Sequence, residues 1–408
     1  AEALGMGGYQ TFMVGKWHVG SEKGSRPLDR GFDKLYGVPK GGGIYFHPFL
    51  IVRDVYLNDK KIENFPDDYY STEAFNTYAT RFIAERANSN DPFFLYVAHI
   101  APHFPLQAPK EVINKYKNRY RQNFQKFRKQ RFLRMKERGI VNDESTLSPP
   151  DQSVKDWEQL TSAEKDTAAL KMATYAAQID VMDRGIGEII KKLKETAEYK
   201  NTIIFFLSDN GACRADVAPE NRGITERGPI GSWKCWKSYG PSWANVSNTP
   251  YRLYKKYTHE GGVITPLIIH YPNTIKNQRI DHQVGHIIDL MPTCLDLADV
   301  PYPSTYQGNQ ILPTEGKSLL PVIQGKKREP HNALFWEHIG NKAVRMKNWK
   351  LVRRYSADNW RLYNLTKDPT ELNDLSSKYP KRVQKMKSAY EEWANKVGVV
   401  PWDKLTEN

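Results

Sequence analysis

The chain has 408 residues, of which 39% are hydrophobic, and it carries a net charge of +14. This length and apolar content allow two domains, or one large domain with an appendage, and no apolar run is long enough to cross a membrane as a helix. Three isolated cysteines exclude a disulfide framework or a zinc knuckle. The positive charge indicates anionic partners, among them sulfated or phosphorylated substrates, acidic polymers, nucleic acid and membrane surfaces.

The amino end predicts the last turn of a helix followed by a strand. Residues 1–4 read as a helix that the following glycines stop, so we expect that the natural chain begins earlier. The strand Tyr9–Val14 then leads into Gly15-Lys16-Trp17-His18. If the backbone stays extended, Lys16 and His18 point to the same face, because side chains alternate along a strand. A cation beside an imidazole suits an oxyanion site, and two ordinary surface residues fit the pattern equally well.

A second apolar strand leads to two histidines. A helix is predicted over Ser71–Ala87, and the strand Phe93–Val97 after it is followed by His99 and His103. The spacing of the two histidines suits a zinc pair on a helix, but the prolines that flank His103 argue against a helix there. We interpret His103 as a positioned acid or base and His99 as a packing residue.

The segment Lys115–Arg138 is strongly basic, with eleven lysines and arginines and a single acid. Its aromatic residues recur every three or four positions, which predicts a stripe along one helical face. One interpretation is a surface that binds nucleic acid or another polyanion. The interpretation that we favour is a helical insertion over about residues 110–140, which docks by its aromatic stripe and turns its basic face to solvent.

A long helix and a buried strand precede the most informative motif of the chain. Thr161 and Glu164 form a capping box, and the helix that they begin is predicted to run to about Tyr199. The strand Ile203–Leu207 is entirely apolar, which is typical of a strand buried on both faces. It ends in Ser208-Asp209-Asn210-Gly211, where Asp209 and Asn210 are hard oxygen donors suited to Ca²⁺ or Mg²⁺. The same residues are also good turn formers.

The remaining elements complete the predicted fold. We expect a loop over 212–256, a buried strand over 263–270, a helix over 289–298, and, past residue 330, short antiparallel strands with a final helix over 379–397. The alternation of strands and helices predicts an α/β fold with a mostly parallel sheet between helices. A small C-terminal antiparallel sheet with one helix follows, so we expect domains over 1–329 and 330–408.

Four motifs together resemble those of the type I sulfatases, which are arylsulfatase-like members of the alkaline phosphatase superfamily. They are Gly15-Lys16-Trp17-His18, Pro102-His103-Phe104-Pro105, Ser208-Asp209-Asn210-Gly211, and Lys255 five residues before Glu260-Gly261-Gly262. Asn348-Trp349-Lys350-Leu351-Val352 and Leu362-Tyr363-Asn364-Leu365 also look like the second subdomain of that family. The order and spacing of the motifs extend the resemblance over essentially the whole chain, and imply the alkaline phosphatase-like fold.

The resemblance implies a role for each motif in sulfate-ester hydrolysis. Asp209 and Asn210 would bind the metal, usually Ca²⁺ and less often Mg²⁺. Lys16 and Lys255 would hold the sulfate, with His103 as proton donor at the leaving group. His18 would help to release sulfate from the covalent intermediate. The implied partner is a sulfated small molecule or glycan, with no nucleic acid or membrane, and the family's bacterial members are often periplasmic or secreted.

The chain departs from this family in two respects. The formylglycine nucleophile forms in a C/S-x-P-x-R motif, which does not occur in the sequence, and the paired metal-binding aspartates at the end of the first strand have no match, since Asp67-Asp68 follows a proline in a polar loop. We expect both to lie upstream, so that the 408 residues alone are inactive. A degenerate member that binds without turnover is the other explanation. A phosphomonoesterase or phosphonate hydrolase, and a polyanion-binding protein that uses residues 115–138, are the remaining alternatives. Residues 41–49 and 212–256 are expected to select the substrate.

Overall fold

A five-stranded sheet forms the amino-terminal part of the computed structural model, which describes residues 1–42, 45–46, 53–87, 89–214, 228–357 and 359–406. After α1 (Glu2–Met6), the fully buried run of β1 (Gln10–Lys16) lies in the centre. Two parallel strands flank it, β2 (Lys34–Val38) and β5 (Phe93–Ala98). The antiparallel strands β3 (Tyr56–Leu57) and β4 (Lys60–Lys61) extend the β2 edge. The predicted strands at residues 9–14 and 93–97 are therefore confirmed.

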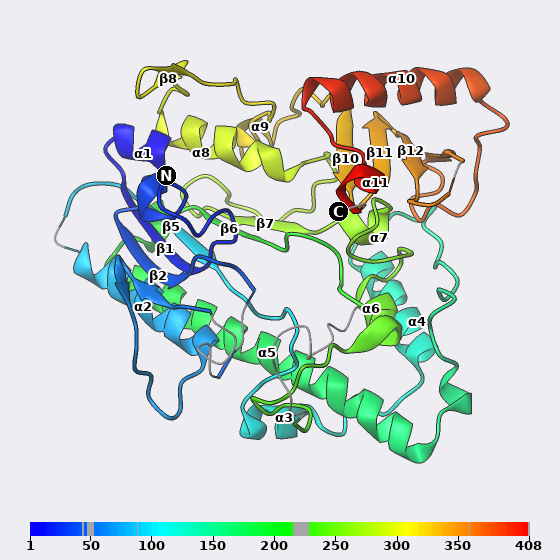
Figure 1. Ribbon diagram of the computed structural model, residues 1–408, viewed down its shortest axis with the longest axis horizontal. Helices are drawn as coiled ribbons and strands as arrows, with labels where there is room; N and C mark the ends of the chain where they lie inside the picture. Colours follow the sequence, from blue (N-terminus) through cyan, green and yellow to red (C-terminus); the bar gives the residue numbers. More distant parts are fainter. Residues whose placement is uncertain (43–44, 47–52, 88, 215–227, 358, 407–408) are drawn as a thin grey trace.

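Two helices pack together beside this sheet. They are α2 (Ser71–Glu85) and α5 (Ser162–Glu195), and Figure 1 shows them side by side. The predicted capping box begins α5, because Thr161 Oγ1 accepts a hydrogen bond from the Glu164 backbone N–H at 3.2 Å while Glu164 Oε2 accepts one from the Thr161 N–H at 3.0 Å. Phe12, Phe75 and Ala177 share the buried core between sheet and helices. Among the described residues, no helix is long and apolar enough to span a membrane.

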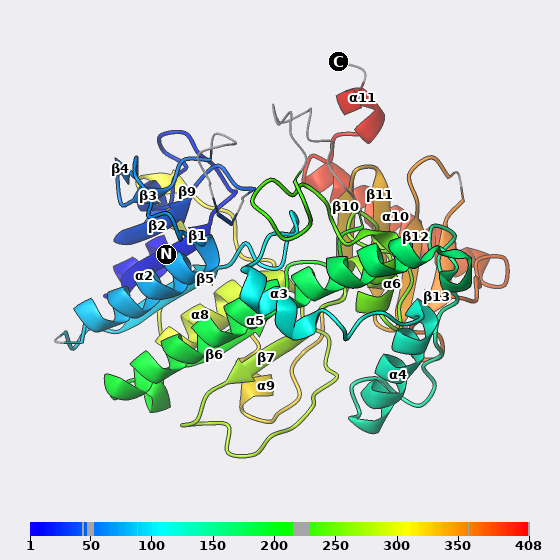
Figure 2. The ribbon, with the colours of Figure 1, turned by 90° about the horizontal axis from the view of Figure 1, so that it is seen from below.

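The strand before the Asp209 motif differs from the prediction. β6 (Ile204–Leu207) pairs with β7 (Leu267–His270) in a separate, antiparallel pair. It is not buried on both faces, since Phe206 is 42% exposed and Ile268 of β7 is 58% exposed. Neither β6 nor β5 has a strand partner on its second edge within the described part of the chain. Figure 2 shows the β6–β7 pair on the β5 side of the larger sheet. The predicted strand over 263–270 is also shorter, because α7 (Glu260–Val263) occupies its beginning.

The basic segment forms two helices instead of one stripe. The first helix, α3 (Lys110–Tyr116), ends before α4 (Phe124–Glu137), which Asn123 caps by accepting a hydrogen bond from the Gln125 N–H at 2.8 Å. Phe124 is buried edge-on against Trp157 and Trp243, with ring centroids 4.9 Å away in both cases. The guanidinium of the fully buried Arg128 donates to Ser148. The segment is therefore helical and packs by aromatic residues, as expected, but these residues do not share one helix face, so the single docking stripe that we predicted is wrong.

The connections between the main elements contain several short helices and one small hairpin. They are η1 (Leu28–Arg30), η3 (Trp157–Gln159), η4 (Tyr199–Asn201), α6 (Gly240–Ser247), η6 (Ile287–Asp289), α8 (Leu290–Ala298), α9 (Leu320–Ile323) and the hairpin of β8 (Thr305–Tyr306) with β9 (Asn309–Gln310). α6 gives order to the long segment predicted as a loop, in which residues 215–227 lie outside the described residues. Residues 43–44 and 47–49 of the predicted substrate-selecting segment lie outside them as well.

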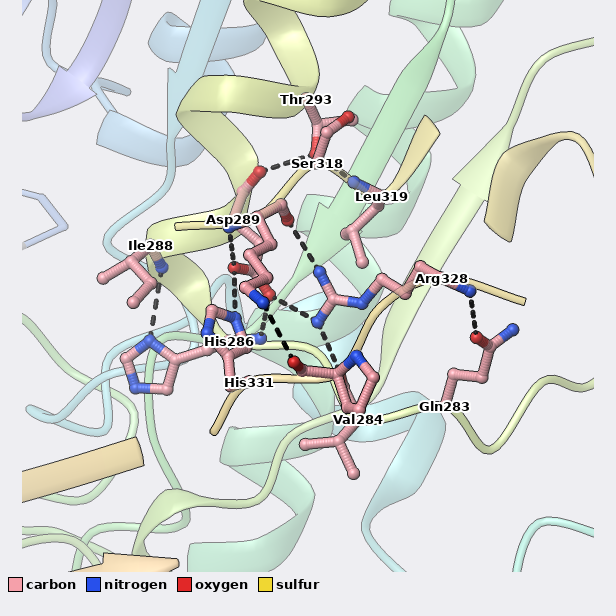
Figure 3. A network of polar contacts seen from close by, with 12 residues as sticks. Gln283, Val284, His286, Ile288, Asp289, Thr293, Ser318, Leu319, Arg328 and His331 are labelled. Atoms are coloured by element: carbon pink, nitrogen blue, oxygen red, sulfur yellow. Dashed lines mark hydrogen bonds and ion pairs between the residues drawn. The ribbon is translucent and has the colours of Figure 1, made fainter. Parts of the chain in front are cut away.

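A buried polar network fixes the start of α8. Asp289, which is fully buried, accepts hydrogen bonds from the backbone N–H groups of His286 and Lys317, at 2.8 Å each. Its carboxylate also contacts the guanidinium of Arg328 at 2.8 Å and Nε2 of His331 at 2.7 Å (Figure 3). The network joins the α8 region to the chain that leads into the C-terminal sheet.

The C-terminal sheet is antiparallel, as predicted. It consists of β10 (Leu334–His338), β11 (Asn341–Met346), β12 (Trp349–Arg353) and β13 (Arg361–Asn364), in that order. α10 (Pro380–Lys396) covers one face (Figure 1), where Met386 and Tyr390 pack against Val344 and Leu351. α11 (Trp402–Thr406) follows. The structure thus confirms an α/β fold with a small C-terminal antiparallel sheet and helix.

Candidate functional site

Lys16 stands at the carboxyl end of the central strand β1. The strand approaches its neighbours closely there, because a Cβ on Gly15 would lie 2.1 Å from the carbonyl oxygen of Ala98 on β5. Lys16 is half-buried. Burial and then the positive charge of Lys255 lower the pKa of Lys16, with a smaller contribution from Arg53, while Asp209 opposes them. An anion bound between these cations would reduce their mutual repulsion, so the site favours anion binding.

His18 does not continue the strand, contrary to the prediction. Its backbone has a φ of +59°, in the left-handed region, so the alternation that would place it on the face of Lys16 ends before it. The ring is exposed and packs beside Gly41. Burial lowers the pKa of His18, and the charges of Lys16, Arg53 and Lys255 lower it further. His18 is therefore close enough to the same cations to feel their charge, although a left-handed turn, and not the predicted extended strand, places it there.

His103 lies on the loop after β5. Its Nδ1 is 2.7 Å from the carbonyl oxygen of Phe104, which can only accept, so Nδ1 carries the proton and Nε2 has a free lone pair. Burial lowers the pKa of His103 to about 4, and Lys255 and Lys16 lower it too, whereas Asp209 raises it. The imidazole is thus neutral at pH 7 in the free protein. An anion bound beside it would raise its pKa and favour the proton-donating form.

Buried side chains that the sequence did not reveal hold the His103 loop in place. The hydroxyl of the fully buried Tyr45 donates to the His103 carbonyl oxygen at 2.6 Å. Tyr70 donates to the carbonyl oxygen of Gln107 at 3.0 Å, and Gln178 on α5 donates to that of Pro105 at 2.9 Å. These contacts connect positions 58, 37 and 73 residues apart in sequence. Because the partners are so far apart in the sequence, no local pattern identifies these residues.

Asp209 and Asn210 follow β6. Gly211 lets this tip pack on the next loop, since a Cβ there would lie 1.9 Å from the carbonyl oxygen of Gly261. The side chain of Asp209 is exposed, and its carboxylate has no hydrogen bond or ion pair within the described residues. Its charge contributes to the raised pKa of Tyr96 on β5, after burial, and to the pKa shifts of Lys16 and His103.

These oxygen donors fit a hard cation but form only part of a ligand set. Ca²⁺ takes six to eight oxygen ligands. The described residues contain no group of three or more His, Cys, Asp or Glu side chains placed to hold a metal. Asp209 and Asn210 can therefore supply two ligand residues of such a site, and the others would have to come from elsewhere.

Lys255 lies on the loop before α7, and Asn248 holds that loop against the Asp209 tip. The Lys255 N–H donates to the carbonyl oxygen of Ala212 at 3.0 Å. The Asn248 amide donates to the carbonyl oxygens of Leu253 and Gly261, at 2.8 and 2.7 Å, and accepts from the Ala212 N–H at 2.9 Å. Sequence reasoning missed Asn248, and it missed Arg53, whose charge reaches Lys16 and His18. Neither residue lies in a recognisable motif.

Because burial lowers the pKa of both histidines that follow β5, we predict that acid destabilises the protein. Burial lowers the pKa of His99 to about 4 from an ordinary value of 6.5, and neither of its ring nitrogens has a hydrogen-bond partner among the described residues. The unfolded chain therefore binds more protons between these two pH values, so stability falls as the pH decreases through that window. Between pH 6.5 and 4, we expect the free energy of unfolding of His99→Phe to fall by about 3 kcal/mol less than that of the unsubstituted protein. Urea unfolding at several pH values measures this, and an unchanged slope would contradict it.

Comparisons with known proteins give the family of this chain. A family model described as sulfatase matches residues 1–300, and one described as N-sulphoglucosamine sulphohydrolase, C-terminal, matches residues 251–396. An uncharacterized sulfatase of Schizosaccharomyces pombe is 32% identical over 439 aligned positions, covering 100% of this chain and 78% of that protein. An arylsulfatase of Klebsiella aerogenes is 35% identical, covering 80% of this chain and 73% of its own.

The likeness extends to solved structures. The crystal structure of Ps i-CgsB superimposes with a TM-score of 0.67 at 23% identity, over 96% of this chain and 73% of that one. A sulfatase from Bacteroides fragilis, yidJ, gives a TM-score of 0.62 at 19% identity, over 97% and 77%. At this level of identity the structures show a shared fold. Together with the family match over most of the chain, they establish that this protein belongs to the sulfatase family, whose members are sulfuric ester hydrolases.

Proposed function

We propose that this protein binds the sulfate group of a sulfated sugar at the carboxyl ends of β1, β5 and β6, and that it takes part in hydrolysis of the ester. The observation that carries the proposal is that Lys16, Lys255 and Asp209 all act electrostatically on a neutral His103, while Arg53 acts on Lys16 and His18. A sulfate ester is an anion that gains charge on its leaving oxygen as the bond breaks. Such a site stabilises that charge where it develops.

Each predicted residue has a role in this proposal. Lys16 and Lys255 bind the sulfuryl oxygens, which relieves the repulsion that lowers the pKa of Lys16. Once the anion is bound, His103 accepts a proton from solvent at Nε2, and it donates this proton to the leaving oxygen as the bond between sulfur and that oxygen breaks. His18, at the exposed rim, interacts with the outgoing sulfate. We also propose that residues 1–329 form the catalytic part and that residues 330–408 form a separate subdomain.

Asp209 and Asn210 would hold Ca²⁺, which when bound would neutralise charge on the sulfuryl oxygens. We propose that the remaining ligands and the formylglycine nucleophile come from polypeptide outside the 408 residues. Among the strands that the structure describes, none pairs with the second edge of β5 or β6, which supports this. A strand that paired with both edges, parallel to β5, would end at the same side of the sheet as Asp209.

A sugar is the substrate class that the relatives support. The structure of BT4656 contains D-glucosamine-2-N,6-O-disulfate, named as its substrate, and superimposes here with a TM-score of 0.57 at 20% identity. Ps i-CgsB is known in complex with k-i-k-neocarrahexaose. These ligands belong to those proteins. They make a sulfated glycan the class to test first.

Equilibrium dialysis with 4-methylumbelliferyl sulfate tests the proposal. We expect the 408-residue protein to bind this ester more tightly with Ca²⁺ than without, and D-glucosamine 6-sulfate to displace it while D-glucosamine does not. We expect no release of inorganic sulfate. Absence of binding would overturn the sulfate site. Turnover would overturn the placement of the nucleophile outside these residues, because the sequence lacks the formylglycine motif.

A further inference from the structure

A lysine of the C-terminal sheet is completely buried between two carboxylates. Lys350 is the second residue of β12 and is 0% exposed. Its Nζ is 2.5 Å from Oε1 of Glu260 and 3.2 Å from Oε1 of Glu371, which are 5% and 0% exposed. Glu260 begins α7, five residues after Lys255. The ion triad therefore joins the C-terminal sheet to the loop that carries a proposed sulfate-binding residue.

Glu371 connects both ends of that loop, which we call the Lys255 segment (residues 252–260). Its Oε2 accepts a hydrogen bond from the backbone N–H of Glu260 at 2.9 Å. Its backbone carbonyl oxygen accepts one from the guanidinium of Arg252 at 3.1 Å. The backbone of Glu371 has a φ of +59°, a left-handed conformation that a non-glycine residue adopts only when its surroundings enforce it.

The first turn of the C-terminal sheet contacts the middle of the Lys255 segment. The Asn341 amide donates to the carbonyl oxygen of Lys256 at 3.0 Å. The hydroxyl of Thr258 donates to the carbonyl oxygen of Lys342 at 3.1 Å. Lys256 itself has a φ of +84°, so the chain next to Lys255 is held in a conformation that it would not adopt alone. The segment thus contacts Glu371, which follows the C-terminal sheet, at its beginning and end, and the sheet itself at its middle and end.

The same segment contacts the proposed metal-binding tip on its other side. The Lys255 N–H donates to the carbonyl oxygen of Ala212, and the Gly211 N–H donates to that of Gly262, two residues after the segment, both at 3.0 Å. We propose that Lys350 and Glu371 are positioning residues, which set the place of Lys255 beside Asp209 by holding the Lys255 segment between the C-terminal sheet and the Asp209 tip. This inference rests on the proposed role of Lys255 in sulfate binding.

The chemistry of the triad suits orientation better than stability. Burying an ion pair removes the hydration of both charges, and their mutual attraction offsets only part of that free-energy cost. Apolar residues of similar volume in the same place are therefore often as stable. Directional ion pairs and hydrogen bonds, in contrast, allow a single arrangement of the loop. Lys350 supplies a single positive charge for two carboxylates, so both must approach its ammonium group closely. That requirement fixes Glu260, and with it the path of the chain back to Lys255.

The test compares affinity for 4-methylumbelliferyl sulfate, measured by equilibrium dialysis at a temperature where each variant is folded. Lys350→Met and Glu371→Ala break the triad. Glu371→Gln keeps an acceptor for the Glu260 N–H and serves as the conservative variant. Leu351→Ala is the matched control, because Leu351 is the next residue of β12 and is fully buried on the opposite face, against α10. It removes packing from the same strand without touching the Lys255 segment.

We expect Lys350→Met and Glu371→Ala to weaken binding about 10-fold or more, the scale on which outer-shell partners act, and Glu371→Gln to weaken it less. Leu351→Ala should lower the melting temperature and leave the affinity unchanged. Unchanged affinity in folded Lys350→Met and Glu371→Ala would overturn the positioning role. If Lys255→Met also leaves the affinity unchanged, then the proposed function itself is wrong, so the two failures are distinguishable.

Discussion

Replacing Lys255 by methionine is expected to weaken the binding of 4-methylumbelliferyl sulfate about 10- to 100-fold. A hydrogen bond to a charged group contributes about 1.5–3 kcal/mol, and each 1.4 kcal/mol corresponds to about tenfold in affinity. The substitution keeps the length and apolar stem of the side chain. The backbone contact of Lys255 with Ala212 does not involve the side chain and remains. Equilibrium dialysis measures the change.

Lys256→Met is the matched control for this prediction. Lys256 is the next residue and is exposed, and its charge is not among those that shift the pKa values of Lys16, His18 and His103. We expect its removal to change the affinity less than about twofold, because exposed charges are screened by salt. Equal losses in the two variants would mean that net charge, and not a specific site, attracts the ester. Such a result would contradict the proposed function.

Asp289→Ala is expected to lower the free energy of unfolding by about 3–5 kcal/mol, the cost of removing one partner of a buried ion pair. The alanine leaves the guanidinium of Arg328, whose side chain is only 3% exposed, without its carboxylate. It also removes the acceptor for the backbone N–H groups of His286 and Lys317. The start of α8 and the chain around Lys317 would then lose the contact that joins them (Figure 3).

Urea unfolding measures this effect, with Asp296→Ala as the control. Asp296 lies on the same helix and is exposed, so its replacement should change stability by less than about 0.5 kcal/mol. If Asp289→Ala lost no more stability than this control, the network in Figure 3 would not contribute to the free energy of unfolding.

Features that depend on a few consecutive residues were predictable from the sequence. The capping box at Thr161 begins α5 as expected, because its two hydrogen bonds lie within one helical turn. The apolar run at 93–97 forms β5, and the hairpin spacing past residue 330 forms the C-terminal sheet. The predicted site residues lie at strand ends and adjoining loops for the same reason, since each polar motif directly follows or precedes an apolar run.

Features that depend on distant partners were not predictable. The apolar composition of residues 203–207 indicates a strand but does not say what covers it, and β6 has an exposed ring where full burial was expected. The basic segment has helical periodicity, yet its chain turns between Tyr116 and Phe124 to bury Phe124 against Trp157 and Trp243. In both cases the presence or absence of packing partners far away in sequence, and not the local pattern, sets the outcome.

The sequence by itself therefore determined the order of the elements and the residues of the proposed site, which are two lysines, two histidines, an aspartate and an asparagine. Only the tertiary structure decided which other groups act on them. Arg53, Tyr45, Asn248 and the buried Lys350 lie near the site residues or hold their loops, although none belongs to a motif. The physical reason is that burial and charge act through space, so a pKa or a loop position depends on neighbours that the chain order does not reveal.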